Sequence, residues 1–368
     1  MTVEPTDFAT DAPLDFSYET RPGRVVFRPG AAVSATPGEA ARLGLHRALV
    51  VCGGRGEATA RAVAGALGGQ CAGVHPEARM HVPAEVAARA VEVAREMRAD
   101  GCVAVGGGSA IGLGKAIALR TGLPLIAVPT TYSGSEMTPV WGLTEDGAKR
   151  TGRDLGVQPR SVVYDPELTL GLPVPLSVTS GINALAHAVE ALYAPDASPL
   201  VALMATEGVR AMTAALPAVA AAPGDLDARA RALYGAWLCG ACLGATTMGL
   251  HHKLCHVLGG TFGLPHAETH TVVLPYVLAY NAAAAPRAVA TLSRVLGTDD
   301  VPRALREFAR SLDAPSTLAE LGLREADLAV AAAQAAGQPP PNPREVTAHG
   351  VLGLLTAAYE GWEPRFGS

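Results

Sequence analysis

The sequence predicts an α/β fold in which a domain with a parallel sheet precedes an all-helical domain. In the first half of the chain, short apolar runs that end at glycine or proline alternate with helical patterns. Such runs are typical of buried parallel strands in βαβ units. After about residue 175 the strand-like runs stop, and long Ala/Leu patterns with helical spacing take over. We expect the first domain to span residues 16–176 and the second to span 177–368.

The order of elements in the first domain follows from this alternation. The pattern predicts strands at 48–52, 102–105 and 125–128, and helices at 57–67 and 110–120. Ligands of an open parallel sheet bind beyond the carboxyl ends of its strands. The residues that follow the three runs are therefore the first candidates for a binding site.

The second domain is predicted from helical spacing. Pro173 and Pro175 mark the change of pattern, since proline is found at the ends of helices more often than inside them. The predicted helices cover 180–194, 199–221, 226–248, 250–258, 268–283, 286–296, 302–312, 325–335 and 346–358.

Composition excludes several classes of function. The 368 residues carry a formal net charge of −5 without a basic stripe, so we expect no nucleic-acid or anionic-membrane partner. The longest apolar stretches, 211–222 and 272–285, fall short of the roughly 18–20 residues that a membrane span needs. Residues 1–15 lack the basic and apolar regions of a secretory signal, and we expect them to form a disordered, solvated extension.

The six cysteines are scattered along the chain in the manner of reduced, buried thiols. This usage, in a chain without a secretory signal, predicts a cytoplasmic location. Cys239 and Cys242 form a lone CxxC within an apolar helical pattern, which predicts two buried helix cysteines in place of a metal or redox motif.

The turn after the second predicted strand is a candidate for binding a phosphate. It reads Gly106-Gly107-Gly108-Ser109, and Lys115 follows in the next helix. Glycines let the backbone approach a phosphate closely, and the first N–H groups of a helix attract an anion. The turn is not a G-x-G-x-x-G fingerprint, so a plain tight turn between strand and helix stays open as an alternative.

A second candidate loop follows the next predicted strand. It contains Thr130, Thr131 and Ser133, whose hydroxyls suit a wall for a ribose or phosphate. The alternative is a Ser/Thr-rich turn with a helix cap. Two such loops after consecutive strands favour a nucleotide cofactor.

Histidines are concentrated in one short stretch of the second domain. His187 lies on an earlier predicted helix, four residues after Asn183, and residues four apart share a helix face. A buried imidazole needs polar partners, so packing alone explains this density poorly and a functional cluster is favoured. The stretch holds five of the ten histidines: His251, His252, His256, His266 and His270.

The histidines could ligate a metal ion or act as proton and hydrogen-bond donors. Imidazoles from two helices and a loop are suitable ligands for Zn²⁺ or Fe²⁺. One turn before His187, however, the chain has Asn183 in place of a carboxylate, so the site lacks an anion to offset the charge of an ion. Three neutral histidines can still hold Zn²⁺, so the sequence disfavours a metal without excluding it.

Five long motifs make the chain similar to a known family. On these motifs residues 20–365 resemble the iron-type alcohol dehydrogenase superfamily and, within it, the maleylacetate reductase branch. The resemblance implies a Rossmann-like domain followed by an all-α domain, which is the dehydroquinate synthase-like architecture. The motifs are GGGSAIGLGKAIAL at 106–119, PTTYSGSEMTPVWGLTE at 129–145, VVYDPELTLGLP at 162–173, SGINALAHAVEALYA at 180–194 and GLHHKLCHVLGGTFGLPHAETH at 249–270.

The resemblance also identifies the positions of a metal site. Metal-dependent members carry their ligands at the positions of Asn183, His187, His252 and His266. Asn183 stands where they have Asp, and Gly112 stands where many have another Asp. Both departures are similar to maleylacetate reductases and imply that a metal is not required. If a metal is bound, these three histidines would hold it, with Asn183 in place of the usual Asp.

The activity that the resemblance implies is reduction of the conjugated C=C of 2-maleylacetate to 3-oxoadipate by NADH or NADPH, in aromatic compound degradation. The expected substrate is thus a small dicarboxylate, and the family expectation is a homodimer. The implied catalytic residues are His252, His256, His187, His266 and Lys253. The implied cofactor-binding residues are Gly106, Gly107, Gly108, Ser109, Lys115, Thr130, Thr131 and Ser133.

Several alternatives stay open at this point. The chain could be a metal-dependent alcohol or aldehyde dehydrogenase, or a reductase of another conjugated keto acid in secondary metabolism. It could also be a nucleotide-binding scaffold without catalysis, although the glycine turn and the histidine set argue against this. Arg55 could contact the 2′-phosphate of NADPH or lie in a plain surface loop, so the choice between NADH and NADPH is open. Cys255, among the histidines, could explain sensitivity to thiol reagents.

Overall fold

A computed structural model describes residues 23–145 and 148–364. The extension predicted for residues 1–15 lies outside this range. The chain divides into two compact units, each of which is described by itself. The α/β unit runs to Pro173 and also includes Ala221–Leu233, whereas the helical unit comprises Val174–Ala220 and the chain from Tyr234 onward. The domain limits of 16–176 and 177–368 stay a prediction.

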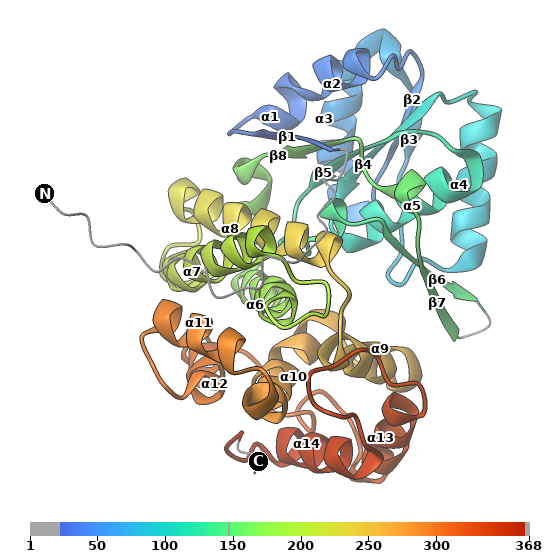
Figure 1. Ribbon diagram of the computed structural model, residues 1–368. Coiled ribbons are helices and arrows are strands. Elements are labelled where there is room, and N and C mark those ends of the chain that lie inside the picture. The colour runs from blue at the N-terminus through green and yellow to red at the C-terminus, as the bar shows by residue number, and fades with distance from the viewer. Residues whose placement is uncertain (1–22, 146–147, 365–368) are drawn as a thin grey trace, which may run out of the picture. The chain divides into compact units, whose positions relative to one another are not determined.

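The α/β unit is built on a six-stranded parallel sheet with the order β1-β8-β5-β4-β2-β3 (Figure 1). Its strands are β1 (Arg24–Phe27), β2 (Ala48–Val51), β3 (Cys71–His75), β4 (Gly101–Gly106), β5 (Leu125–Pro129) and β8 (Ser161–Tyr164). Its helices are α1 (Ala31–Ser34), α2 (Thr36–Arg42), α3 (Glu57–Leu67), α4 (Ala84–Glu96) and α5 (Gly108–Thr121). A separate antiparallel hairpin consists of β6 (Val140–Glu145) and β7 (Ala148–Arg153). The three strands and two helices predicted here are confirmed.

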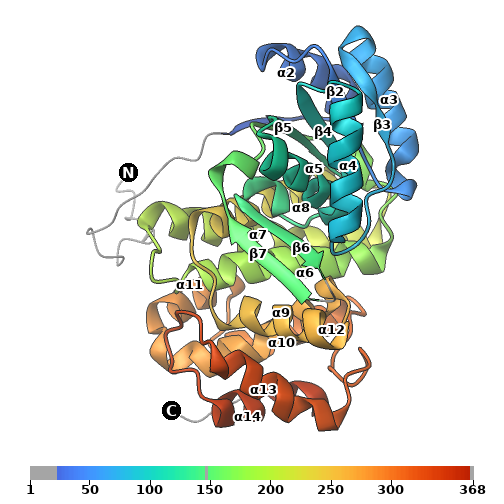
Figure 2. The same ribbon diagram turned by 90° about the vertical axis from the view of Figure 1, so that its right-hand side faces the viewer.

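Both faces of the sheet are covered, so β2, β4, β5 and β8 are buried at every position. Val50, Val103 and Ile126 share one face and pack in a core with residues of α1, α2 and α3. On the other face, Gly114 of α5 packs so closely that an added Cβ would lie 2.7 Å from Leu125. Figure 2 shows α4 and α5 side by side on this face.

The direction of the strand order reverses between β2 and β4. The chain continues from β2 to β3 on one side and returns to β4 on the other. A reversal of this kind leaves the loops after the two strands diverging, and open α/β sheets bind ligands there. These loops begin at Cys52 after β2 and at Gly107 after β4.

The helical unit contains nine helices in its described residues, with α8 beginning in the α/β unit. They are α6 (Val174–Ala191), α7 (Pro199–Ala221), α8 (Leu226–Ala245), α9 (Leu250–Phe262), α10 (His266–Asn281), α11 (Pro286–Leu296), α12 (Val301–Ser311), α13 (Leu328–Gly337) and α14 (Ala348–Glu360). All nine predicted helices are present. Helix α6 begins six residues before the prediction because Pro175 fits the first turn, where its missing N–H is not needed.

The helical unit has its own core, which holds α9 and α10 in place. Leu254 and Leu258 of α9 pack with Val273 and Tyr276 of α10, together with α13 and α14. In the described range no single helix is long and apolar enough to cross a membrane. Helices α8 and α9 pass that test only as a pair, and they are bent by 98° where they meet.

All six cysteines are free, and all but Cys71 are buried. Cys239 and Cys242 lie one turn apart on α8, as two buried helix cysteines. This confirms the prediction made for the CxxC sequence.

Candidate active site

Three helices of the helical unit bring the histidines together. Helix α6 contributes His187, α9 contributes His251, His252 and His256, and α10 contributes His266 and His270. Spacings of four residues put 252 above 256 and 266 above 270 on their helices. The core that packs α9 against α10 therefore joins two histidine rows into one cluster.

The ring centres lie close enough for direct contact. His252 is near the middle of the cluster, with its ring centre 5.1 Å from that of His187 and 5.0 Å from that of His270. The ring of His256 lies 6.3 Å from that of His252, and the ring of His266 lies 4.5 Å from that of His270. The four histidines predicted as catalytic thus belong to one cluster, although His266 is itself exposed.

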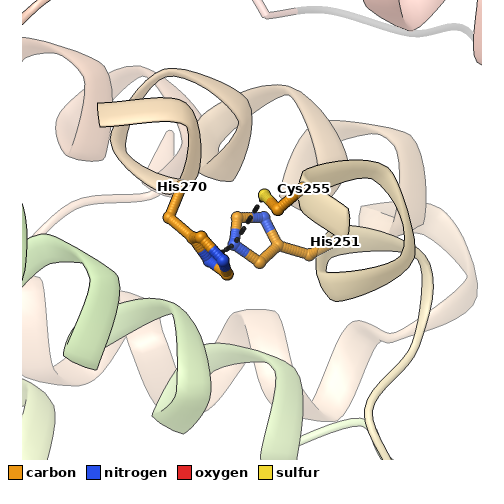
Figure 3. Close-up of side chains that lie close together, drawn as sticks. All are labelled: His251, Cys255 and His270. Atoms are coloured by element: carbon orange, nitrogen blue, oxygen red, sulfur yellow. Dashed lines mark hydrogen bonds between the residues drawn. The ribbon is translucent and has the colours of Figure 1, made fainter. Parts of the chain in front are cut away.

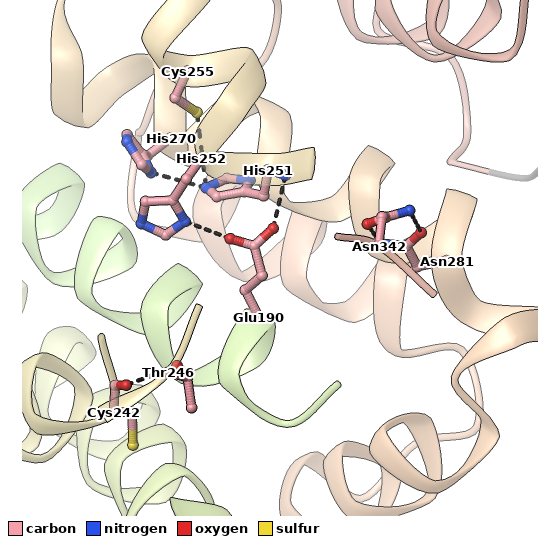
Figure 4. A network of polar contacts seen from close by, with 9 residues as sticks. All are labelled: Glu190, Cys242, Thr246, His251, His252, Cys255, His270, Asn281 and Asn342. Atoms are coloured by element: carbon pink, nitrogen blue, oxygen red, sulfur yellow. Dashed lines mark hydrogen bonds and ion pairs between the residues drawn. The ribbon is translucent and has the colours of Figure 1, made fainter. Parts of the chain in front are cut away.

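A buried carboxylate anchors this cluster (Figure 4). Glu190 lies one turn after His187 on α6 and is 1% exposed. Its Oε2 is 2.5 Å from Nδ1 of His252, and its Oε1 accepts a hydrogen bond of 2.8 Å from the backbone N–H of His251. The inference that the site lacks an anion is therefore wrong. The carboxylate lies one turn after His187 and not one turn before it.

Glu190 is charged in this environment. Burial alone would raise the pKa of its carboxyl, but the attraction of His252 and the two hydrogen bonds lower the pKa overall. A carboxylate that accepts from Nδ1 of a histidine fixes the orientation of the ring and directs Nε2 away from itself. Nε2 of His252 is buried and has no protein partner in the described structure.

His251 and His270, which are not among the predicted catalytic residues, form a second pair of rings. Nε2 of His251 and Nδ1 of His270 are 2.8 Å apart, which is the length of a hydrogen bond (Figure 3). The thiol of Cys255 lies 3.8 Å from the same nitrogen of His251. All three side chains are buried.

Burial favours the uncharged forms of three imidazoles and one thiol of the cluster. It lowers the pKa of His251 to about 3, and it lowers the pKa values of His187 and His270 well below 6.5, with neighbouring imidazoles adding to the effect. Burial also raises the pKa of the Cys255 thiol well above 9.0. These groups can donate and accept hydrogen bonds at neutral pH without carrying charge.

Several buried atoms of the cluster have no hydrogen-bond partner among the described residues. Buried polar groups are nearly always paired, so a group of unpaired atoms in one place indicates that a ligand or water completes their hydrogen bonds. The atoms are Asn183 Oδ1, His187 Nδ1, His251 Nδ1, His252 Nε2 and His270 Nε2. Lys253, predicted to meet a substrate carboxylate, is half-buried on α9.

In the α/β unit, the glycine turn has the properties that a dinucleotide needs. Gly106 has φ +145°, and a Cβ added there would lie 2.9 Å from Cβ of Ala110. Helix α5 begins at Gly108 with no side chain capping its first N–H groups. Gly108 is exposed, and an added Cβ there would meet nothing within 4 Å. The helix N-terminus is therefore open to an anion.

The loop after β5 packs against this turn. A Cβ added at Gly107 would lie 2.8 Å from Cγ2 of Thr131. Thr130 and Thr131 are half-buried, and the hydroxyl of Ser133 is buried without a partner in the described range. The predicted cofactor residues of the two loops are thus neighbours.

Lys115 has a different environment from the rest of the predicted cofactor set. Its ammonium donates to Ser135 O at 2.6 Å, Val140 O at 2.7 Å and Thr138 Oγ1 at 2.9 Å. Burial lowers its pKa to about 7, against the attraction of Glu136. Because all three donors have acceptors inside the unit, the geometry favours a structural role over contact with a cofactor phosphate.

Both units match known protein families. Residues 22–166 match the iron-containing alcohol dehydrogenase model, and residues 177–359 match the model of the C-terminal region of the Fe-containing alcohol dehydrogenase family. The chain belongs to the iron-containing alcohol dehydrogenase family. The resemblance inferred from the motifs is confirmed.

Three relatives in this family are similar to the chain in sequence or structure. It is 53% identical to a maleylacetate reductase of Burkholderia cepacia, over 95% of this chain and 99% of that protein. The crystal structure of maleylacetate reductase from Agrobacterium tumefaciens superposes with a TM-score of 0.92 at 51% identity, over 95% of this chain and 99% of that one. The maleylacetate reductase from Rhizobium sp. strain MTP-10005 also gives 0.92 at 51% identity, over 96% and 100%.

The name of the family raises the question of whether these residues fit a metal ion. The positions inferred for ligands hold Asn183, an uncharged amide, and three imidazoles. In the described structure the ligand atoms of His187, His252 and His266 do not all lie within 4.8 Å of one another, whereas those of His251, Cys255 and His270 do. The latter group contains a nitrogen pair at hydrogen-bond distance. As placed, the donor set does not fit a divalent cation.

Proposed function

We propose that this chain reduces the conjugated C=C of 2-maleylacetate to 3-oxoadipate with NADH or NADPH. Maleylacetate reductases are its relatives at about half identity over nearly the whole chain. The single observation that carries the chemistry is the set of buried ring nitrogens without partners around His252. Such nitrogens are suited to stabilise an oxygen that becomes negative during the reaction.

The α/β unit would hold the cofactor. When bound, NADH or NADPH supplies the hydride. The open N-terminus of α5 and the two loops are suited to its phosphates and ribose. The residues proposed for this role are Gly106, Gly107, Gly108, Ser109, Thr130, Thr131 and Ser133. Arg55 is exposed in the loop after β2, where it could distinguish the two nucleotides.

The helical unit would stabilise the reacting substrate. Addition of hydride to the carbon β to the ketone turns the ketone into an enolate, and a proton then reaches the α carbon. His252 is oriented by Glu190, so its Nε2 is available to the substrate. We assign His256, His187 and His266 to the same group of donors. We assign Lys253 to a substrate carboxylate. An oxyanion donor is typically worth ~3–4 kcal/mol of transition-state stabilisation.

The test is oxidation of NADH and of NADPH by the full chain with maleylacetate as substrate. We expect turnover, and we expect His252→Ala and His256→Ala each to lower kcat/KM at least roughly tenfold, or about 1.4 kcal/mol, with the fold intact. Wild-type kcat/KM in both variants would refute the assignment. Binding of the nucleotide without turnover on any keto acid would instead support a noncatalytic scaffold.

The same assay with and without exhaustive chelation separates this proposal from its main alternative. Activity that persists after chelation, with substoichiometric Zn and Fe, is expected. Stoichiometric metal and loss of activity would favour a metal-dependent alcohol or aldehyde dehydrogenase. A homodimer and a cytoplasmic location stay predictions.

A further inference from the structure

We propose that His270 donates a hydrogen bond to the enolate oxygen of the substrate, and that His251 is the positioning residue that determines which nitrogen of His270 carries the proton. This inference rests on the proposed function and adds a catalytic residue to it. His270 is not among the four histidines that the resemblance implies to be catalytic.

The His270 ring lies among the rings of the proposed donors. Its centre lies 4.5 Å from that of His266, 5.0 Å from that of His252 and 6.3 Å from that of His187. The side chain is fully buried on α10. It is therefore part of the same cluster as the proposed donors and not a neighbour at its edge.

The two ring nitrogens of His270 have different environments. Nδ1 is 2.8 Å from Nε2 of His251, and Nε2 is buried with no partner in the described structure. A neutral imidazole has one N–H and one bare nitrogen. One of the two rings must donate across the 2.8 Å contact, which leaves two possible arrangements of protons.

The two arrangements differ in where an unpaired N–H is left. If His270 donates to His251, the unpaired N–H is Nδ1 of His251, which is buried with no acceptor among the described residues. If His251 donates to His270, the unpaired N–H is Nε2 of His270, on a ring whose centre lies 4.5 Å from that of His266 and 5.0 Å from that of His252. Buried N–H groups without acceptors are rare. The second arrangement is favoured because a substrate oxygen can accept from that N–H.

Glu190 and Cys255 hold His251 in place, so His251 can determine which nitrogen of His270 carries the proton. Its backbone N–H donates to Oε1 of Glu190 at 2.8 Å, while Oε2 of the same carboxylate holds His252 (Figure 4). The Cys255 thiol lies against the ring edge of His251 (Figure 3). One carboxylate therefore positions both the ring that contacts His270 and its neighbour on α9.

An enolate is the substrate oxygen that suits such a donor. A neutral imidazole N–H is a weak partner for a carboxylate in water, but in a buried site it can stabilise an oxygen as negative charge develops. Loss of an interaction that forms only in the transition state should lower kcat and kcat/KM together and leave KM unchanged.

The experiment compares His270→Phe, which keeps a planar ring, with His270→Gln, whose amide N–H can replace Nε2–H. We expect His270→Phe to lower kcat and kcat/KM by the same factor, about 10²–10³, with KM for maleylacetate within about twofold. We expect His270→Gln to recover at least tenfold of that loss. His349→Phe, at an exposed position on α14, is the matched control and should behave as wild type.

The positioning role is tested by His251→Phe and His251→Gln, of which only the second can still donate to His270. We expect kcat to fall at least tenfold in His251→Phe, with KM unchanged, and to return toward wild type in His251→Gln. Equal loss in both, or a rise in KM alone, would overturn the assignment. Thermal unfolding of each variant identifies one that fails to fold, in which case the Gln variants decide.

Failure of this inference is distinct from failure of the proposed function. If the wild-type chain turns over maleylacetate and His270→Phe keeps its kcat, only the inference is lost. If the wild-type chain does not oxidise NADH or NADPH with maleylacetate, both are lost.

Discussion

The two units each bury a polar cluster, and the clusters differ in how completely their atoms are paired. In the α/β unit, Lys115 uses all three donors on oxygens of its own unit. Tyr164 donates to Oε1 of Glu136 at 2.8 Å, which leaves Oε2 of Glu136 as the one atom of this group without a partner in the described structure. In the helical unit, Glu190 is paired, but the ring nitrogens around it are left without partners. Pairing is a mark of structural groups, whereas a group of orphaned atoms indicates a place where a ligand completes the set.

The clusters also differ in charge. Burial lowers the pKa of Lys115 to about 7 and raises that of Glu136, so these neighbours are pushed toward their neutral forms. In the helical unit Glu190 remains ionised while three imidazoles are kept neutral. A permanent carboxylate surrounded by neutral donors can orient those donors without neutralising them, which is the arrangement that oxyanion stabilisation needs.

The largest expected effect is a loss of stability in acid. The pKa values of His187, His251 and His270 are lower in the native state than in the unfolded chain, where histidine titrates near 6.5. The unfolded chain therefore binds protons first as pH falls below 6.5. The contribution of the three neutral rings to the free energy of unfolding is complete above pH 6.5 and is lost below it. The loss is about 1.4 kcal/mol per pH unit for each ring, or about 4 kcal/mol per pH unit for the three.

The measurement is the free energy of unfolding from denaturant titrations between pH 7.5 and 5.5. Glu136 contributes in the opposite direction, since its raised pKa makes the native state bind a proton first. The decisive quantity is therefore the difference between wild type and His270→Gln, whose slope with pH should be smaller by about 1.4 kcal/mol per unit. Identical slopes would mean that His270 is protonated in the native state.

The second prediction concerns the anchor of the histidine cluster. Glu190→Gln keeps the shape of the side chain but removes the charge that holds His252 and the backbone of His251. We expect kcat/KM for maleylacetate to fall about 10–100-fold, as is typical when a group that orients an active-site histidine is lost. The matched control is Glu207→Gln on α7, which breaks an exposed pair with Arg210 and should change stability by less than about 1 kcal/mol and activity not at all.

The sequence predicts more of the fold than of the contacts within the site. The inner strands β5, β4 and β2 contain long apolar runs and were predicted, whereas β8 and the edge strands β1 and β3 were missed. Strand β8 lies between β1 and β5 and is buried, but its only consecutive aliphatic residues are Val162 and Val163. The residues of β3 are only half-buried apart from His75, and they include Gly73, so the stretch lacks an apolar run. Helix α4 was also missed, although its apolar positions recur at helical spacing and carry the signal.

For the site, residue types could be found from the sequence but pairings could not. The density of histidines identified the stretch that forms the cluster. Glu190 was overlooked because an acid on a helix is usually solvated, and its burial depends on α9 packing beside α6. The contact between His251 and His270 depends in the same way on α9 packing against α10. Spacing along one helix contains no information about either contact.

The third prediction tests whether Lys115 is structural. Lys115→Met keeps much of the volume but leaves two carbonyl oxygens and a hydroxyl without their shared donor. We expect the free energy of unfolding to fall by about 2 kcal/mol, with KM for NADH within about threefold of wild type. If Lys115 instead held a cofactor phosphate, KM would rise at least about tenfold while stability changed little.

The smallest effects should come from two adjacent glycines of the turn. A Cβ at Gly107 would lie 2.8 Å from Thr131, whereas a Cβ at Gly108 would meet nothing within 4 Å. Gly107→Ala should therefore cost about 1–2 kcal/mol of stability through overpacking. Gly108→Ala should leave stability within about 0.5 kcal/mol and raise KM for NADH a few-fold, because the new methyl group occupies space in front of the helix N-terminus. Steady-state kinetics and denaturant titration of both variants separate packing from binding, and an unchanged KM in Gly108→Ala would move the phosphate away from this turn.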